Sequence, residues 1–177
     1  MEKLLELAKK EYPAKKRFTA LFLEAIFFLI ILPFLLVWLG GAVDRCLNLP
    51  DLSAGIFNVL LGVPVIFAGW LFAIWSIYVQ FTIGRGTPIP VMATQELIIQ
   101  PPYSYCRNPM TLGAIVMYTG VSILVGSIGA FLLVVIGATA LLTYIHKFEE
   151  QEMILRFGDA YKEYRRQTPF FFPSFKR

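Results

Sequence analysis

One uncharged stretch constrains the fold of this chain more than any other feature. Asn108 to Ile145 contains 38 residues without Asp, Glu, Lys or Arg, and one helical crossing of a bilayer takes about 20 residues. Two crossings fit into this stretch only as a tight hairpin. The turn signal Gly126-Ser127-Ile128-Gly129 lies in its middle, so both open ends of the hairpin face the same side of the membrane.

The composition agrees with a membrane protein. Of the 177 residues, 57% are hydrophobic and 16% are charged, and the mean hydropathy is +0.65, which is too apolar for an ordinary soluble domain. The net charge of +4 does not indicate nucleic-acid binding, because the basic residues cluster beside apolar segments, where lipid headgroups and topology explain them. Cys46 and Cys106 lie in different loops without metal-ligand spacing, so we expect neither a metal site nor a disulfide.

The apolar segments predict an all-α, polytopic protein with about four transmembrane helices in a single membrane domain, residues 1–177. Two spans occupy residues 18–81: Phe18 to Leu39, and roughly Gly55 to Phe81. The helical hairpin of residues 108–146 supplies the other two. Glu24 interrupts the first span, and a carboxylate at the bilayer centre costs about 2.5–3.5 kcal/mol, so we expect it to face the helix bundle or snorkel.

Polar segments flank and separate these spans. Residues 1–17 form a charged, weakly amphipathic head, residues 82–107 a loop that could hold a cofactor, and residues 147–177 a polar tail. In the tail, apolar residues recur at helical spacing, which is typical of an amphipathic helix, and Gly158-Asp159 predicts a break in it.

The distribution of basic residues predicts the topology. The head, the loop of residues 82–107 and the tail together contain fifteen Lys and Arg residues, whereas the loop between the first two spans has only Arg45 and the hairpin turn has none. By the positive-inside rule, both termini are expected in the cytoplasm, where soluble cofactors are available.

The hairpin brings two polar clusters together that are about 40 residues apart in sequence. Arg107 precedes the first arm, and His146, Glu149 and Glu150 follow the second. A guanidinium can hold a carboxylate in a bidentate manner, or it can anchor the helix to lipid phosphate. Glu149 and Glu150 project about 100° apart on a helix and must therefore contact different groups. His146 is either a pocket residue or a cap near the end of the span.

Glycine and capping residues complete the candidate site. Gly84 and Gly86 flank Arg85, and glycines in a loop either form a turn or let the backbone approach a ligand closely. Pro109 suits the first turn of a helix and Asn108 suits its cap. Gly113 would let another helix or a flat ligand pack closely.

In combination these features resemble a known family. Before the apolar hairpin come Gly-x-Gly and then Arg-x-Pro, with a glycine four residues beyond the proline. After the hairpin come Glu-Glu, then Phe157-Gly158-x-x-Tyr161-x-x-Tyr164, and finally a closing segment from Pro169 to Pro173. This order is similar to that of the integral-membrane methyltransferases of the isoprenylcysteine carboxyl methyltransferase and phospholipid methyltransferase superfamily. The resemblance covers Gly84 to Pro173, about half of the chain.

The resemblance implies S-adenosylmethionine as the methyl donor and a lipid-like or prenylated acceptor within the bilayer. It implies that the donor pocket is lined by Gly84, Gly86, Arg107, Gly113, His146, Glu149 and Glu150, with Arg107 and Glu150 as the catalytic residues. In this reading Arg107 clamps the donor carboxylate or steadies the acceptor, and the two glutamates fix the amino or ribose groups and balance the sulfonium.

The acceptor follows less directly from the pattern. The tail and Arg-x-Pro favour isoprenylcysteine carboxylate O-methylation, whereas Asn108-Pro109-Met110 and the Gly-x-Gly and Glu-Glu pair are similar to the phospholipid N-methyltransferases. Asn108 replaces the histidine of the isoprenylcysteine enzymes, and Thr111 replaces a tyrosine common to both branches. An amine acceptor would need a base, for which His146 and Glu150 are candidates.

Two further functions are compatible with the sequence. The tail also resembles membrane sterol reductases, which use a nicotinamide cofactor, although fewer spans are visible here than such reductases have. Alternatively, the chain is a non-catalytic membrane scaffold that has kept the pocket.

Overall fold

The computed structural model describes residues 12–88 and 92–174 of the chain. All regular structure within these ranges is helical, which confirms the predicted all-α class. The elements are α2 (Ala14–Ile26), the π-helical turn η1 (Phe27–Ile31), α3 (Leu32–Leu47), α4 (Ile56–Thr82), α5 (Pro109–Val125), α6 (Ile128–Tyr144), the π-helical turn η3 (Ile145–Glu149) and α7 (Glu150–Gln167).

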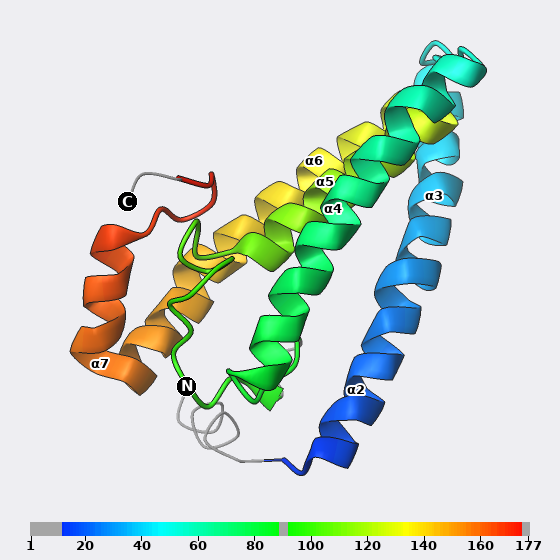
Figure 1. Ribbon diagram of the computed structural model, residues 1–177. Helices are drawn as coiled ribbons and strands as arrows, with labels where there is room; N and C mark the ends of the chain where they lie inside the picture. Colours follow the sequence, from blue (N-terminus) through cyan, green and yellow to red (C-terminus); the bar gives the residue numbers. More distant parts are fainter. Residues whose placement is uncertain (1–11, 89–91, 175–177) are drawn as a thin grey trace.

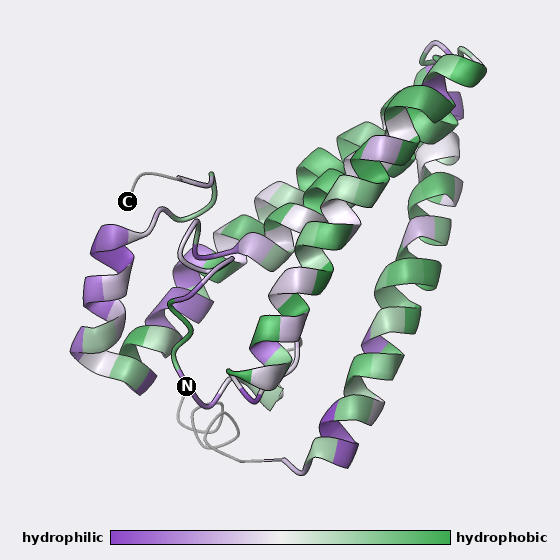
Figure 2. Cartoon of the chain, in the orientation of Figure 1, coloured by the Kyte–Doolittle hydropathy of each residue, from purple (hydrophilic) through white to green (hydrophobic). Residues whose placement is uncertain are grey.

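The helices form an elongated bundle of antiparallel rods with α7 at one end (Figure 1). In the described residues three helices are long and apolar enough to cross a membrane: Ala14–Leu47, Ile56–Thr82 and the helix that begins with α6 at Ile128. The apolar α5 has 17 residues, or about 25 Å. Figure 2 shows that the rods are mainly hydrophobic and that α7 is mainly hydrophilic, so the chain is a multi-pass membrane protein whose apolar part ends with α6.

The first helix is longer than predicted. Phe18–Leu39 was expected to be followed by a loop, but the helix runs over Ala14–Leu47 and ends at Asn48, whose φ of 49° is left-handed. The predicted end was wrong because Gly40 packs against α6, where an added Cβ would lie 2.6 Å from the Ala130 Cβ. Close packing thus keeps the Gly40-Gly41 pair in the helix, although two adjacent glycines would otherwise favour a turn.

The predicted head is described only in part. Residues 1–11 lie outside the described residues, and from Ala14 the chain already belongs to the first helix. Glu24 is buried, with 5% of its surface exposed, which confirms that it faces the bundle. Contacts on both sides of it fix α2 and η1 to the bundle: Arg17 Nη1 donates to the Phe81 carbonyl (2.9 Å), and the Tyr118 hydroxyl donates to the Phe28 carbonyl (2.8 Å).

The hairpin turn lies where the sequence predicted it. α5 ends at Val125, and Gly126 adopts a left-handed φ of 66°. The Ser127 hydroxyl then caps α6 by accepting a hydrogen bond from the Ala130 amide (2.9 Å), while Asp44 of α3 accepts one from the Gly129 amide (2.6 Å). The turn is therefore fixed both by its own sequence and by the first helix.

Close packing of α4 and α5 sets the depth of the polar loop before α5. A Cβ on Gly69 would lie 2.6 Å from the Gly113 carbonyl oxygen, and one on Gly113 would lie 2.6 Å from the Ala73 amide nitrogen. In this antiparallel register the Tyr103 hydroxyl, just before α5, reaches the Ser76 carbonyl at 3.5 Å. α4 continues to Thr82, about 9 Å further, so the loop lies beside the last turns of α4.

We predict that Gly69→Ala lowers the free energy of unfolding by about 1–3 kcal/mol, because its methyl group would overlap backbone atoms of α5. Gly137→Ala is the matched control: its Cβ would meet no atom of the described residues within 4 Å, so the change is expected to be neutral or to stabilise by about 0.5–1 kcal/mol. Thermal unfolding in detergent measures both variants. Equal melting temperatures would contradict the close α4–α5 packing.

Candidate active site

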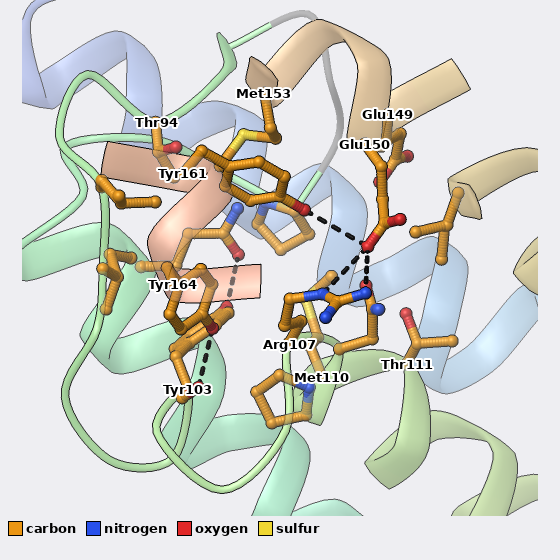
Figure 3. Close-up of a pocket in the computed structure, with 17 residues that line it drawn as sticks. Thr94, Tyr103, Arg107, Met110, Thr111, Glu149, Glu150, Met153, Tyr161 and Tyr164 are labelled. Carbon is orange, nitrogen blue, oxygen red and sulfur yellow. Dashed lines mark hydrogen bonds and ion pairs between the residues drawn. The ribbon is translucent and has the colours of Figure 1, made fainter. Parts of the chain in front are cut away.

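A cavity of about 160 Å³ lies where the loops before α5 meet η3 and α7. It is walled by the start of α5, by residues 94–98 and by the tyrosines of α7 (Figure 3). Its polar lining consists of Gln80, Thr94, Tyr103, Arg107, Asn108, Thr111, Glu149, Glu150, Tyr161 and Tyr164. Gln80 belongs to the last turns of α4, so the cavity lies at their depth.

A buried ion pair joins the two polar clusters that the sequence predicted to be neighbours. Arg107 Nη2 lies 2.5 Å from Glu150 Oε1, and Arg107 Nε donates to the same oxygen at 2.9 Å. Their side chains are 9% and 3% exposed. The predicted proximity of Arg107 and the Glu149-Glu150 pair is thus confirmed, across 43 positions of sequence.

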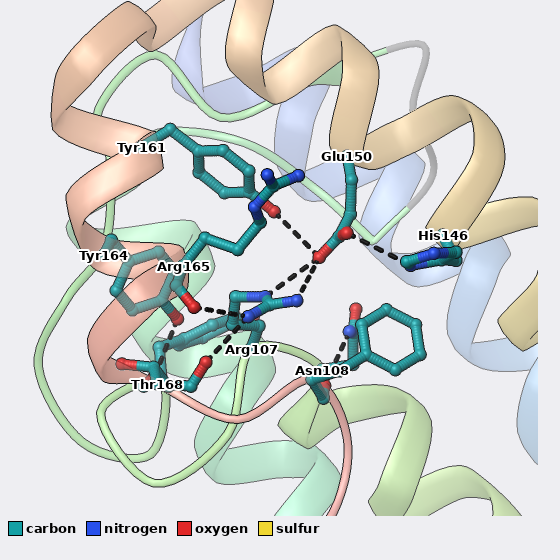
Figure 4. A network of polar contacts seen from close by, with 10 residues as sticks. Arg107, Asn108, His146, Glu150, Tyr161, Tyr164, Arg165 and Thr168 are labelled. Atoms are coloured by element: carbon teal, nitrogen blue, oxygen red, sulfur yellow. Dashed lines mark hydrogen bonds and ion pairs between the residues drawn. The ribbon is translucent and has the colours of Figure 1, made fainter.

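The remaining hydrogen bonds of Arg107 hold the C-terminal segment (Figure 4). Its Nη1 donates to the carbonyl oxygens of Arg165 (3.0 Å) and Thr168 (2.7 Å), and its backbone amide donates to the Pro169 carbonyl (2.9 Å). One side chain therefore ties together the entrance of α5, the start of α7 and the tail.

Glu150 has two further partners. The Tyr161 hydroxyl donates to Oε1 at 3.4 Å, and His146 Nδ1 lies 3.2 Å from Oε2. The side chain of His146 is 67% exposed, and its ring meets Phe170 edge to face with the centroids 5.4 Å apart. His146 thus supports Glu150 from the outside and does not line the cavity.

Glu149 is the carboxylate that remains available in the cavity. Within the part of the chain that the structure describes, it makes no hydrogen bond or ion pair, and no dashed line reaches it in Figure 3. Burial, together with the nearby Glu152 carboxylate, raises the pKa of Glu149 to about 7. Glu150 thus pairs with Arg107 while Glu149 stays unpaired among the described residues, which agrees with the expectation that adjacent carboxylates on a helix do not reach the same group.

Three tyrosines form much of the remaining wall. The Tyr164 hydroxyl donates to the Tyr103 carbonyl (2.7 Å), and burial raises the pKa of Tyr103, Tyr161 and Tyr164 well above the usual range, so all three phenols stay protonated. From the sequence, Tyr161 and Tyr164 are named only as part of the tail pattern, and Tyr103 is not singled out. Their helical spacing was the available signal for the first two, and Tyr103 offered none.

The predicted glycines lie near the cavity but do not line it. Gly84 and Gly86 are buried against the segment that carries Thr94: a Cβ on Gly84 would lie 2.8 Å from Thr94 Cγ2, and one on Gly86 would lie 2.7 Å from the Thr94 amide nitrogen. Gly113 lies in the α4–α5 contact, so of its two predicted uses the structure realises the packing of a helix.

The two residues that open α5 behave differently. Pro109 is the first residue of α5, as predicted. Asn108 occupies the cap position but makes no capping hydrogen bond with its side chain; its Nδ2 donates instead to the Phe170 carbonyl (2.9 Å). The predicted cap position is therefore confirmed, but the side chain does not cap the helix, because the tail, far away in sequence, offers the amide another partner.

We predict that Arg107→Ala lowers the free energy of unfolding by about 3–5 kcal/mol, because it leaves the buried Glu150 carboxylate without its cation. Arg85→Ala is the matched control, since the side chain of that arginine is 59% exposed and its Nε lies 3.7 Å from Glu96 Oε1. We expect this change to lower the free energy of unfolding by only about 0–1 kcal/mol. Chemical unfolding in mixed micelles compares them. A similar small loss in both variants would show that the Arg107 pair is not a structural tie.

The chain is similar to known proteins over the region that contains this site. The model of the family described as "Phospholipid methyltransferase" matches residues 57–160. A "Methanethiol S-methyltransferase" of Mycobacterium tuberculosis is 28% identical over 103 residues, which are 58% of this chain and 38% of that protein. "Methanethiol S-methyltransferase 2" of Bradyrhizobium diazoefficiens is 27% identical over 132 residues, which are 68% of this chain and 48% of that protein.

The matches thus span less than half the length of these relatives. The family match, however, covers more than half of this chain and includes Arg107, Glu149 and Glu150. The chain therefore belongs to the phospholipid methyltransferase family, within the superfamily that its sequence pattern resembles.

Proposed function

We propose that this chain is a membrane methyltransferase that transfers a methyl group from S-adenosylmethionine to a lipid-like acceptor. The observation that carries the proposal is Glu149: a partly buried carboxylate that has no partner among the described residues, in a cavity at the depth of the last turns of α4. Membership of the family supports the reaction class. The proposed topology, with both termini in the cytoplasm, would give the donor access from that side.

The residues of the cavity fit the chemistry of this donor. S-adenosylmethionine carries a sulfonium whose methyl group is the one transferred, an ammonium and a carboxylate. Glu149 can hold a cationic group, and the faces of Tyr103, Tyr161 and Tyr164 suit a cation or a flat base. At about 160 Å³ the cavity is smaller than typical ligand sites of about 300–1,000 Å³, so binding would require the end of α7 near Arg165 to move outward.

Arg107 and Glu150 would keep their ion pair while the donor is bound. We propose that Arg107 Nη1 meets the donor carboxylate in place of the Arg165 carbonyl, the longer of its two bonds at 3.0 Å. Glu150 then positions the guanidinium, and Tyr161 holds Glu150. Methyl transfer is an in-line displacement, so the main tasks of these residues are alignment and the exclusion of water.

We predict that donor affinity rises with pH because Glu149 must be ionised to hold a cation. A carboxyl group of pKa about 7 is mostly protonated at pH 6 and mostly ionised at pH 7.5, so affinity is expected to increase up to about eightfold between them. Calorimetry in detergent measures it. Glu149→Gln should bind more weakly and lose the pH dependence, whereas Glu163→Gln, an exposed change on α7, should behave as wild type.

The acceptor proposed first is the carboxylate of an isoprenylcysteine, which agrees with the tail pattern and needs no base. A second candidate is a thiol, favoured by the names of the two relatives. A thiol must lose a proton, and a carboxyl group whose pKa is about 7 can accept it at neutral pH. A phospholipid amine would place the same demand on Glu149 or Glu150.

Incubation with radiolabelled donor, prenylcysteine, alkyl thiols and total lipid extract separates these acceptors. For a carboxylate acceptor we expect an alkali-labile methyl ester, and Glu149→Gln should raise the donor KM while kcat stays close to wild type. For a thiol or amine acceptor the label would resist alkali, and Glu149→Gln would lower kcat by about 10²–10⁴-fold, because the base would be lost. Donor binding without label in any acceptor would contradict catalysis and favour the scaffold function.

A further inference from the structure

The segment after α7 turns back to the entrance of α5. Residues 168–174 run beside residues 105–108: the Arg107 amide donates to the Pro169 carbonyl and the Ser174 amide donates to the Tyr105 carbonyl, both at 2.9 Å. The side chains of Arg107 and Asn108 add bonds to two further carbonyls of the segment. We call residues 168–174 the strap; Figure 4 shows Thr168 of the strap held next to Arg107.

The packing register places the strap within the depth of the membrane helices. Its partner loop ends at Pro109, where α5 begins, and Tyr103 of that loop contacts the Ser76 carbonyl of α4. α4 continues for six residues beyond Ser76, to Thr82, or about 9 Å. Because the strap is hydrogen-bonded to this loop, it lies at the level of the last turns of α4 and not beyond them.

The aromatic residues of the strap point in different directions. Phe170 turns inward, against His146 and below the Arg107 guanidinium at 5.6 Å from its ring centroid. Phe172 is 78% exposed and meets the half-buried Phe171 edge to face, with 5.2 Å between centroids. An exposed phenylalanine at this depth would face lipid and the headgroup boundary, where aromatic rings are favoured.

Exposed aromatic residues of the neighbouring helix lie at the same level. Tyr144 and Phe148 are 45% and 57% exposed and stack with centroids 5.4 Å apart. They flank Ile145, which lines the cavity, and His146, which touches the strap. The strap thus extends an aromatic border that begins at the end of α6.

We propose that the strap docks into the leaflet nearest the cavity through Phe172, with the lipid bilayer as its partner. Since the strap also holds Arg107 and Asn108, this contact would hold the wall of the cavity in place from the membrane side. The proposal depends on the packing register and the exposure of the strap, and does not depend on which reaction the cavity supports.

Site-specific fluorescence quenching tests the proposal on the full chain. In a Cys46→Ser background, which removes the exposed cysteine and leaves the buried Cys106, Phe172→Cys is labelled with an environment-sensitive dye. The protein is reconstituted into phosphatidylcholine vesicles that carry a spin label on the acyl chain near the headgroup. We expect a blue-shifted emission and strong loss of fluorescence with the spin-labelled lipid.

Glu163→Cys, on an exposed and charged part of α7, is the matched control and should show little quenching. Unchanged melting temperatures would verify that both labelled variants are folded, as expected for exposed positions. Equal and weak quenching at residues 172 and 163 would overturn the proposal. So would efficient crosslinking between two Phe172→Cys chains combined with weak lipid quenching, because the strap would then contact a second copy.

Discussion

The buried ion pair between Arg107 and Glu150 is the interaction on which the rest of the site depends. Moving two charges out of water costs several kcal/mol per ion, and their attraction offsets this cost only when the remaining hydrogen bonds are satisfied. Here the guanidinium also serves two tail carbonyls, and the carboxylate also serves Tyr161 and His146. The pair therefore fixes one arrangement of α5, α7 and the tail, since separating any of them would leave a buried charge unsatisfied.

Close helix packing gives this polar cluster its position along the apolar helices. The α4–α5 contact through Gly69 and Gly113 admits no side chain between the backbones, so it fixes the axial register of the two helices. α5 is shorter than α4, and the loop that carries Arg107 consequently lies beside α4. A family member that methylates lipid-like molecules would need such a placement, because its acceptor arrives from the bilayer and its donor from water.

The adjacent glutamates illustrate how one helix serves structure and chemistry at once. Glu150 turns to Arg107 and is 3% exposed as a side chain, whereas Glu149 faces the cavity, where burial raises its pKa to about 7. A carboxylate that a cation already neutralises is a positioning group. A carboxylate such as Glu149, which has no partner in residues 12–88 and 92–174, can respond to a ligand, and for this reason the proposed donor binding is assigned to it.

The sequence by itself determined the membrane class, the hairpin turn at Gly126 and the proximity of Arg107 to Glu149-Glu150, because the length of an uncharged segment and the bilayer thickness leave few topologies. Only the tertiary structure decided the end of the first helix, which depends on Gly40 meeting Ala130, and the partner of Asn108, which is a tail carbonyl. It also decided which glutamate is paired and which tyrosines line the cavity. These outcomes depend on contacts between residues far apart in the chain, and local patterns of charge and hydropathy carry no information about which of several polar groups will meet.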